Sequence, residues 1–272
     1  MSKVVGISQK IKRVWLDLLL DELARTKEEP ALRSLLDDQL KQELPGKESR
    51  AKAAGIILQI WSPVSSERVS VRDRAVELLP RISGRERIWL HWGMTSLAYP
   101  FFRDVAEIVG RLSTLQDDFS TAQVQNRMVT NWGDRTTTKE AVQKLITSML
   151  DWGVLRSAKN KGHFLLSSKI TTANIELQFW LLEVQLKSSA ADEIELQHLL
   201  RQPSLFPFAF SIGPGDLRKC ESFNIHRQGL DTDIVSLTNA KQRGNTNPVP
   251  KLGRAAAVGQ TQLDFSSPRG KS

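Results

Sequence analysis

Residues 119–169 read FSTAQVQNRMVTNWGDRTTTKEAVQKLITSMLDWGVLRSAKNKGHFLLSSK, and the pattern of this stretch decides the predicted fold. Ser120 is a suitable N-cap for a helix that begins at Thr121, and Gly133 is a suitable end for it. Beyond the next turn, apolar residues at helical spacing predict a second helix with one buried face: Val142, Leu145, Ile146 and Met149. Three consecutive residues are candidate caps for that helix: Thr136, Thr137 and Thr138.

A basic hairpin follows the second helix. Gly153 leads into a strand at residues 154–155, residues 160–162 make a turn, and residues 163–166 return. Between Asp151 and Glu176 the chain has no acidic residue, and its basic residues there are Arg156, Lys159, Lys161 and Lys169. This charge balance is expected of a segment that lies along a phosphate backbone.

The order helix, turn, helix, hairpin is typical of a winged helix, in which the second helix enters a DNA groove and the hairpin is the wing. We expect Val142 and Trp152 to hold that helix against the core, while its other face stays in solvent. The predicted DNA-binding surface consists of Arg135, Thr137, Lys139, Gln143, Lys144, Thr147, Arg156, Lys159, Lys161 and His163. Winged helices also bind proteins, and an exposed face with lysines is often only solvated. Glu140, in the middle of this face, counts against DNA.

Length and charge set the outer limits. A chain of 272 residues favours two compact units and a tail. The formal net charge is +8, but residues 239–272 contribute +5 of it, which leaves +3 for residues 1–238. Any DNA-binding surface on the body is therefore a local patch. One cysteine, Cys220, excludes an intramolecular disulfide, and no apolar run approaches the roughly 20 residues of a membrane span. We expect a cytoplasmic protein.

Residues 1–116 are predicted to form a bundle of helices. The first has an apolar stripe composed of Ile7, Ile11, Val14, Trp15, Leu18, Leu19 and Leu23. Further helices are expected at residues 29–44, 48–61, 69–79, 85–99 and 101–115, with ends at proline or glycine. Four tryptophans lie on apolar helical faces and are expected in the core rather than as base-stacking platforms: Trp15, Trp61, Trp89 and Trp92.

The winged-helix module with its following helices is assigned to residues 117–202, a small β element to residues 203–238 and a tail to residues 239–272. A long helix is expected from Ile175 to Leu186 and a shorter one at residues 192–200. Residues 206–212 alternate like a strand, residues 213–215 resemble a turn, and residues 222–227 and 234–237 are two more expected strands.

Enzymatic activity has little support in the sequence. The four histidines lie far apart, none has a partner at metal-ligand spacing, and no phosphate-binding or nucleophile motif is present. A nuclease-like set could be assembled from Asp216, Lys219, Asp231 and Asp233, since two carboxylates and a lysine can hold Mg²⁺. Such sets are usually ordinary loop residues. We expect no enzyme, no metal and no cofactor.

Three segments resemble the small accessory DNA-binding (BrxA-like) proteins of BREX phage-defence systems. They are ERIWLHWGM at residues 86–94, FFRDV at residues 101–105 and VQKLITSMLDWGVL at residues 142–155. The resemblance covers roughly residues 5–200. It implies a cytoplasmic, non-enzymatic bacterial DNA-binding protein that works beside a methyltransferase and other large antiviral defence proteins. Residues 203–238 and the tail depart from the short members of that family, which leaves the choice of partner open.

The tail is rich in glycine, proline, asparagine, glutamine, serine and basic residues, and this composition predicts disorder. It contains QTQLDF at residues 260–265, which resembles the peptide by which bacterial replication and repair proteins bind the sliding clamp. In that interpretation Gln260 enters a polar pocket, and Leu263 and Phe265 are apolar anchors. The alternative is an exposed linker end.

The sequence therefore predicts a non-enzymatic accessory protein that binds double-stranded DNA through a winged helix, in the setting of a BREX-like defence system. The alternative is a winged-helix scaffold for protein partners or a transcriptional regulator, with a clamp-binding peptide in its tail. Dependence on salt separates the two, because contacts to phosphates weaken steeply as salt rises.

Overall fold

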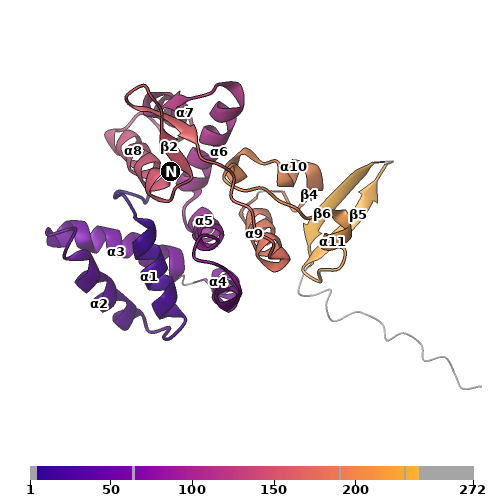
Figure 1. The fold of residues 1–272 in the computed structure, drawn as a ribbon, viewed down its shortest axis with the longest axis horizontal. Coiled ribbons are helices and arrows are strands. Elements are labelled where there is room, and N and C mark those ends of the chain that lie inside the picture. The colour runs from indigo at the N-terminus through magenta and orange to yellow at the C-terminus, as the bar shows by residue number, and fades with distance from the viewer. Residues whose placement is uncertain (1–4, 63–64, 190, 230, 239–272) are drawn as a thin grey trace, which may run out of the picture. The chain divides into compact units, whose positions relative to one another are not determined.

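The computed structural model describes residues 5–62, 65–189, 191–229 and 231–238. Within these ranges the chain is mainly helical, with eleven α-helices and two three-stranded antiparallel sheets. The expectation of a mainly helical fold is confirmed (Figure 1). The tail at 239–272, with its predicted disorder, lies outside the described residues.

Six helices and one 3₁₀ turn make up the first part of the chain. They are α1 (Arg13–Leu23), α2 (Glu29–Leu40), α3 (Lys47–Trp61), α4 (Ser66–Leu78), η1 (Leu79–Arg81), α5 (Arg87–Ala98) and α6 (Pro100–Leu115). Pro30 and Pro100 lie in the first turns of α2 and α6, where a missing N–H costs no hydrogen bond. Helices α1, α2 and α3 contact one another, and α5 contacts α1, α3 and α6.

The predicted stripe of the first helix is partly wrong. Helix α1 begins only at Arg13, and Val14 is 60% exposed, whereas Leu16 and Leu20 are fully buried in its place. Ile7 and Ile11 are buried as expected, but they belong to a non-helical segment before the helix. The backbone of that segment bonds to side chains of a distant helix, so its apolar residues reach the core without helical spacing.

Two helices and a small sheet occupy residues 119–166. The elements are β1 (Phe119–Ser120), α7 (Thr121–Trp132), α8 (Thr136–Asp151), β2 (Leu155–Ser157) and β3 (His163–Leu166). The strands form one sheet in the order β1-β3-β2. Ser120 and Gln123 form a capping box at the start of α7, and Gly133 ends it with φ of 86°. The predicted positions of α7 and β3 are confirmed, whereas β2 extends to Ser157, beyond the predicted strand at 154–155, and β1 was not predicted.

The prediction that a threonine caps α8 is wrong. Arg135 is the N-cap residue, and no side chain makes a capping hydrogen bond there. The three threonines are already helical, and Thr138 is fully buried on the core side. The guanidinium of Arg135 instead donates to the backbone oxygen of Trp132, which ties the start of α8 to the end of α7.

The last described part contains one long helix and a second small sheet. Its elements are α9 (Ile175–Ser188), β4 (Glu193–Glu195), α10 (Leu196–Leu200), η2 (Pro203–Leu205), α11 (Pro214–Leu217), β5 (Phe223–Gln228) and β6 (Thr232–Leu237). The sheet order is β4-β6-β5. Strands β5 and β6 were expected. Residues 193–195 were expected in a helix, but they pair with β6, and the predicted turn at 213–215 opens the short helix α11.

The expected strand at residues 206–212 does not form. The strand-like pairing of these residues is limited to an isolated bridge between Ile170 and Phe208. The alternation has another cause, because Phe206 and Phe208 both enter an aromatic cluster around Trp92, at centroid distances of 5.3 and 5.8 Å. The indole N–H of Trp92 donates to the backbone oxygen of Ser204. This segment is therefore fixed by side-chain packing rather than by a ladder.

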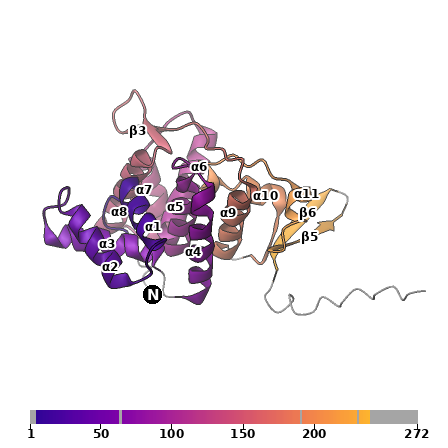
Figure 2. The same cartoon turned by 60° about the horizontal axis from the view of Figure 1, so that its bottom comes forward.

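One continuous hydrophobic core joins the three predicted segments 1–116, 117–202 and 203–238. The tryptophans expected in the core are at most 5% exposed, which confirms that interpretation. Helix α9 lies beside α5 and α4 and contributes buried residues on most of its surface (Figure 2). Among the described residues, no helix combines the length and the apolar character needed to cross a lipid bilayer.

Close helix packing predicts which glycines resist substitution. A Cβ at Gly110 of α6 would overlap the backbone oxygen of Pro203, and one at Gly93 of α5 would lie 2.6 Å from the ring of Trp180. We expect Gly110→Ala to destabilise the fold by about 1–3 kcal/mol, because the obstacle is backbone. Gly55→Ala is the matched control: nothing lies within 4 Å, so the gain in helix propensity should stabilise α3 by about 0.5–1 kcal/mol. Urea unfolding measures both, and equal stabilities would contradict the packing.

A buried histidine predicts a dependence of stability on pH. His91 is fully buried, and its Nε2 lies 3.0 Å from Oδ1 of Asp17. Burial lowers the pKa of His91 below its usual range despite that carboxylate. The pKa of Asp17 is also lowered: burial opposes this, but the hydrogen bond to His91 and the charges of Arg13 and Arg87 outweigh it.

The unfolded chain therefore binds a proton at His91 below a pH of about 6.5, whereas the folded chain binds it only at a lower pH. We expect the free energy of unfolding to fall as the pH drops from 7 to 5, and again through the pH range in which unfolded Asp17 protonates. His91→Gln should flatten the first decrease. His226→Gln, at an exposed position of β5, should leave it unchanged. Parallel pH curves for all three proteins would contradict the assignment.

Candidate nucleic-acid interface

Helix α8 has one apolar side and one polar side. Val142, Leu145, Ile146 and Met149 are at most 2% exposed, as the sequence predicts. The opposite side presents Thr136, Lys139, Glu140 and Gln143 as exposed residues, with Lys144 and Thr147 half-buried at its borders. We call this side, from Thr136 to Thr147, the polar face of α8.

The predicted DNA-binding residues all come from α8 and the following hairpin, and α8 contacts β2 directly. Arg135 is the N-cap of α8, and five of the residues lie on the helix itself: Thr137, Lys139, Gln143, Lys144 and Thr147. Arg156 is on β2, Lys159 and Lys161 are in the turn between the strands, and His163 begins β3. The structure thus brings these residues together on two adjoining elements.

Two of these residues already have acidic partners. The ammonium of Lys139 lies 2.6 Å from Oδ1 of Asp134, and Nδ1 of His163 lies 2.8 Å from Oδ1 of Asp118. The contact of His163 could not be read from the sequence pattern, because Asp118 is 45 residues before His163. By contrast, four exposed or half-buried cations have no ion pair within the described chain: Lys144, Arg156, Lys159 and Lys161.

A shallow depression of about 440 Å³ lies between α7 and the start of α8. Its lining is polar and consists of Gln125, Asp134, Thr136, Lys139, Glu140 and Gln143. The amide of Gln125 donates to the backbone oxygen of Lys139 at 2.9 Å, so this hydrogen bond holds the first turn of α8 against α7. Gln125 and Asp134 are absent from the predicted site. Only their place in the fold, and no spacing, shows that they belong to it.

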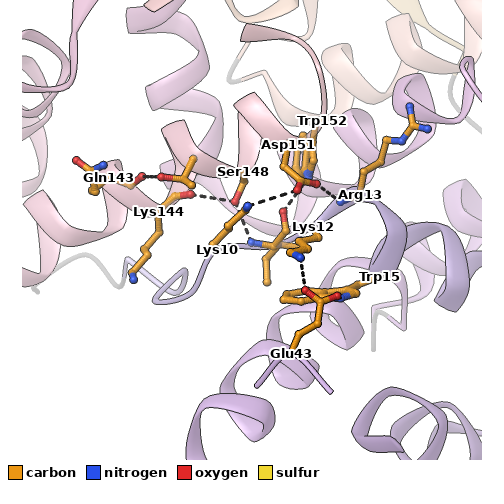
Figure 3. Close-up of polar contacts among 12 residues, drawn as sticks. Lys10, Lys12, Arg13, Trp15, Glu43, Gln143, Lys144, Ser148, Asp151 and Trp152 are labelled. Atoms are coloured by element: carbon orange, nitrogen blue, oxygen red, sulfur yellow. Dashed lines mark hydrogen bonds and ion pairs between the residues drawn. The ribbon is translucent and has the colours of Figure 1, made fainter. Parts of the chain in front are cut away.

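The C-terminal turn of α8 is bound to the segment that precedes α1 (Figure 3). Oγ of Ser148 accepts from the backbone N–H of Ile11 at 2.9 Å, and Oδ1 of Asp151 accepts from that of Arg13 at 2.8 Å. The indole of Trp152 donates to the backbone oxygen of Ile11 at 3.0 Å. Lys12, the N-cap residue of α1, makes no capping bond, so the carboxylate of Asp151 takes that role from another helix.

Two residues of the nuclease-like set, Asp216 and Asp233, have structural partners. Oδ2 of Asp216 accepts from the backbone N–H of Gly213 at the start of α11, and Asp233 pairs with Arg218 at 2.7 Å. No group of three or more histidine, cysteine, aspartate or glutamate residues in the described chain could hold a metal ion. The peptide residues Gln260, Leu263 and Phe265 lie outside the described residues.

No family model, curated protein or solved structure matches this chain. The functional interpretation therefore depends on the geometry and charge of the polar face of α8 and of the hairpin.

Trp152 is expected to anchor α8 and not to stack on bases, since its side chain is only 3% exposed. Its ring centroid lies 5.7 Å from that of Phe102 and 6.2 Å from that of Trp92. Trp152→Ala should cost about 3–5 kcal/mol of folding free energy. Trp152→Phe keeps most of the ring and loses the bond to Ile11, so it should cost distinctly less. Thermal unfolding compares the two. An alanine variant as stable as the wild type would show that α8 does not depend on this residue.

Proposed function

We propose that this chain is a non-enzymatic protein that binds double-stranded DNA as a winged helix, with the polar face of α8 at a groove and the β2–β3 hairpin on the phosphate backbone. The resemblance to accessory proteins of BREX phage-defence systems suggests the same activity and a setting in antiviral defence. A winged-helix scaffold for protein partners or a transcriptional regulator is the alternative.

The distribution of charge carries the proposal. Residues 135–169 hold seven lysines and arginines against two acidic residues, Glu140 and Asp151, and so have a net charge of +5. Residues 1–238 together have +3, so the rest of the body is slightly acidic, at −2. The positive charge of the body is thus concentrated in α8 and the hairpin. Such a local excess is the electrostatic feature of a nucleic-acid surface on a nearly neutral protein.

The elements also have the order and pairing that this mode of binding needs. Helices α7 and α8 contact each other, and the hairpin that leaves α8 is joined by β1 into a three-stranded sheet. The start of α8 has no side-chain cap, and the N–H groups of Thr136 and Thr137 have no acceptor among the described residues, which leaves these two groups for an anion such as a phosphate. Gly162, with φ of 78°, makes the tight turn that presents Lys159 and Lys161 at the hairpin tip.

The surface is a poor match for an apolar protein interface. The large hydrophobic residues exposed in the described chain are Val14, Leu115 and Ile175, and none belongs to α8 or the hairpin. Protein interfaces normally have an apolar centre, whereas DNA interfaces are polar and positively charged. This contrast favours DNA over a protein partner for the polar face of α8.

Reversal of three unpaired lysines tests the proposal. Lys144, Lys159 and Lys161 replaced together by Glu should weaken binding to a 30-base-pair duplex by more than about a hundredfold. The substitution should also lower the salt slope by about one unit for each phosphate that is no longer neutralised. Fluorescence anisotropy over a range of salt measures both quantities.

The matched control replaces Lys47, Arg201 and Lys219 by Glu. These are exposed cations without ion pairs in the described part of the chain, outside α8 and the hairpin. The control changes the net charge equally, so it should retain most of the affinity and the salt slope. Equal losses in the two triple variants, or no loss in a folded test variant, would reject the surface that we propose.

A further inference from the structure

Glu140 occupies the middle of the polar face of α8. It is exposed and has no hydrogen bond or ion pair within the described residues. Its neighbour Lys139 is paired with Asp134 instead, which draws that ammonium toward the end of α7. Glu140 therefore projects an uncompensated carboxylate from the surface that carries most of the positive charge of the body.

A helical partner at the usual spacing is present but not used. Lys144 lies four residues after Glu140, which is the favourable order for an ion pair on a helix. Five pairs with the same order and spacing do form among the described residues: Glu29–Arg33, Asp37–Lys41, Glu48–Lys52, Glu107–Arg111 and Glu183–Lys187. Lys144 instead lies at the border of α8 near Ser148, whose hydroxyl donates to the backbone oxygen of Lys144.

If α8 enters a groove, as the proposed function requires, the carboxylate of Glu140 lies close either to phosphates or to base edges. Close to a phosphate it would be repelled, so a helix that contacted only the backbone would lose affinity through Glu140. Close to base edges it can accept a hydrogen bond, and in the major groove the amino group at N4 of cytosine is the donor that glutamate recognises.

The surroundings of Glu140 fit a contact to bases. Gln143 is exposed, lies three residues further on the same face, and carries an amide that can bind adenine through N6 and N7. The cations that can reach phosphates are at the borders: Lys144 on the helix, Lys159 and Lys161 at the hairpin tip. This separates base contacts at the centre from backbone contacts at the edges.

We infer that Glu140 is a specificity-determining residue that selects cytosine at one position of the bound duplex through the N4 amino group in the major groove. The inference rests on the proposed function and extends it, because it makes the protein sequence-selective rather than sequence-tolerant. It also predicts that the same residue lowers affinity for all other sequences.

The test begins with selection from a randomised duplex library by the full-length protein, by Glu140→Gln and by Glu77→Gln. Glu77 is an exposed glutamate of α4 without an ion pair among the described residues, so its substitution matches the charge change. The wild type and Glu77→Gln should select the same cytosine. Glu140→Gln should lose the preference at that position and bind unselected duplex at least as tightly as the wild type does.

A modified base then isolates the hydrogen bond. N4-methylcytosine keeps its Watson–Crick pair but replaces the amino hydrogen that faces the major groove. At the selected position it should weaken wild-type binding by about tenfold, the size expected for one base contact, and leave Glu140→Gln unaffected. Thermal unfolding of each variant confirms that the exposed substitution leaves the fold intact.

The failures are distinguishable. If the wild type binds no duplex at any salt concentration, the proposed function is rejected and the role of Glu140 with it. If the wild type binds DNA without a base preference, with the same preference as Glu140→Gln, or equally well with N4-methylcytosine, the role of Glu140 is rejected while DNA binding stands.

Discussion

The contact between Trp152 and the segment before α1 holds the polar helix in place. The ring of Trp152 packs on Trp92 of α5 and Phe102 of α6, and its N–H binds the backbone oxygen of Ile11. One residue at the end of α8 thus joins three helices and the N-terminal segment. The direction of α8, and with it the polar face, depends on this point because both its ends are fixed: the start by Arg135 and Gln125, the end by Trp152.

A helix held in this way can have two very different sides. The core side is tightly buried, so its residues are restricted to apolar types of suitable volume. The polar face has no such restriction, and its residues reflect what it meets in solution. Glu140 is an acidic residue on this face, and Asp134 is a second one in the adjoining depression. The surface therefore carries both signs of charge. A uniformly positive surface could attract nucleic acid through its phosphates but could not discriminate among sequences.

The sequence predicted the local parts of this fold well, because their causes are local. The capping box of Ser120, the glycines at 133, 153 and 162, and the apolar period of α8 are all determined within a few residues. It failed where distant contacts decide the outcome. Apolar residues alternate at 206–212 because Phe206 and Phe208 enter an aromatic cluster. Residues 193–195 form a strand because their backbone pairs with β6.

For the candidate site the same division holds. The residues of α8 and of the hairpin could be placed on one surface from periodicity and turn signals. Their hydrogen-bond partners could not be predicted, because these partners come close only in the folded chain. Asp118 contacts the ring of His163, Gln125 binds the backbone oxygen of Lys139, and Asp151 binds the backbone N–H of Arg13. The importance of Glu140 has the same origin, since the absence of an ion pair with Lys144 is a property of the structure and not of the spacing.

The cap that α8 provides for α1 has a consequence for the order in which the chain acquires its structure. Asp151 lies 138 residues after Arg13, so the first helix lacks this cap until the chain has been synthesised well beyond its first five helices. Until then the backbone groups of Ile11 and Arg13 also lack the partners that Ser148, Asp151 and Trp152 provide in the folded chain. Completion of the N-terminal bundle has to wait for α8, which makes docking of that helix a late and long-range step of folding during translation.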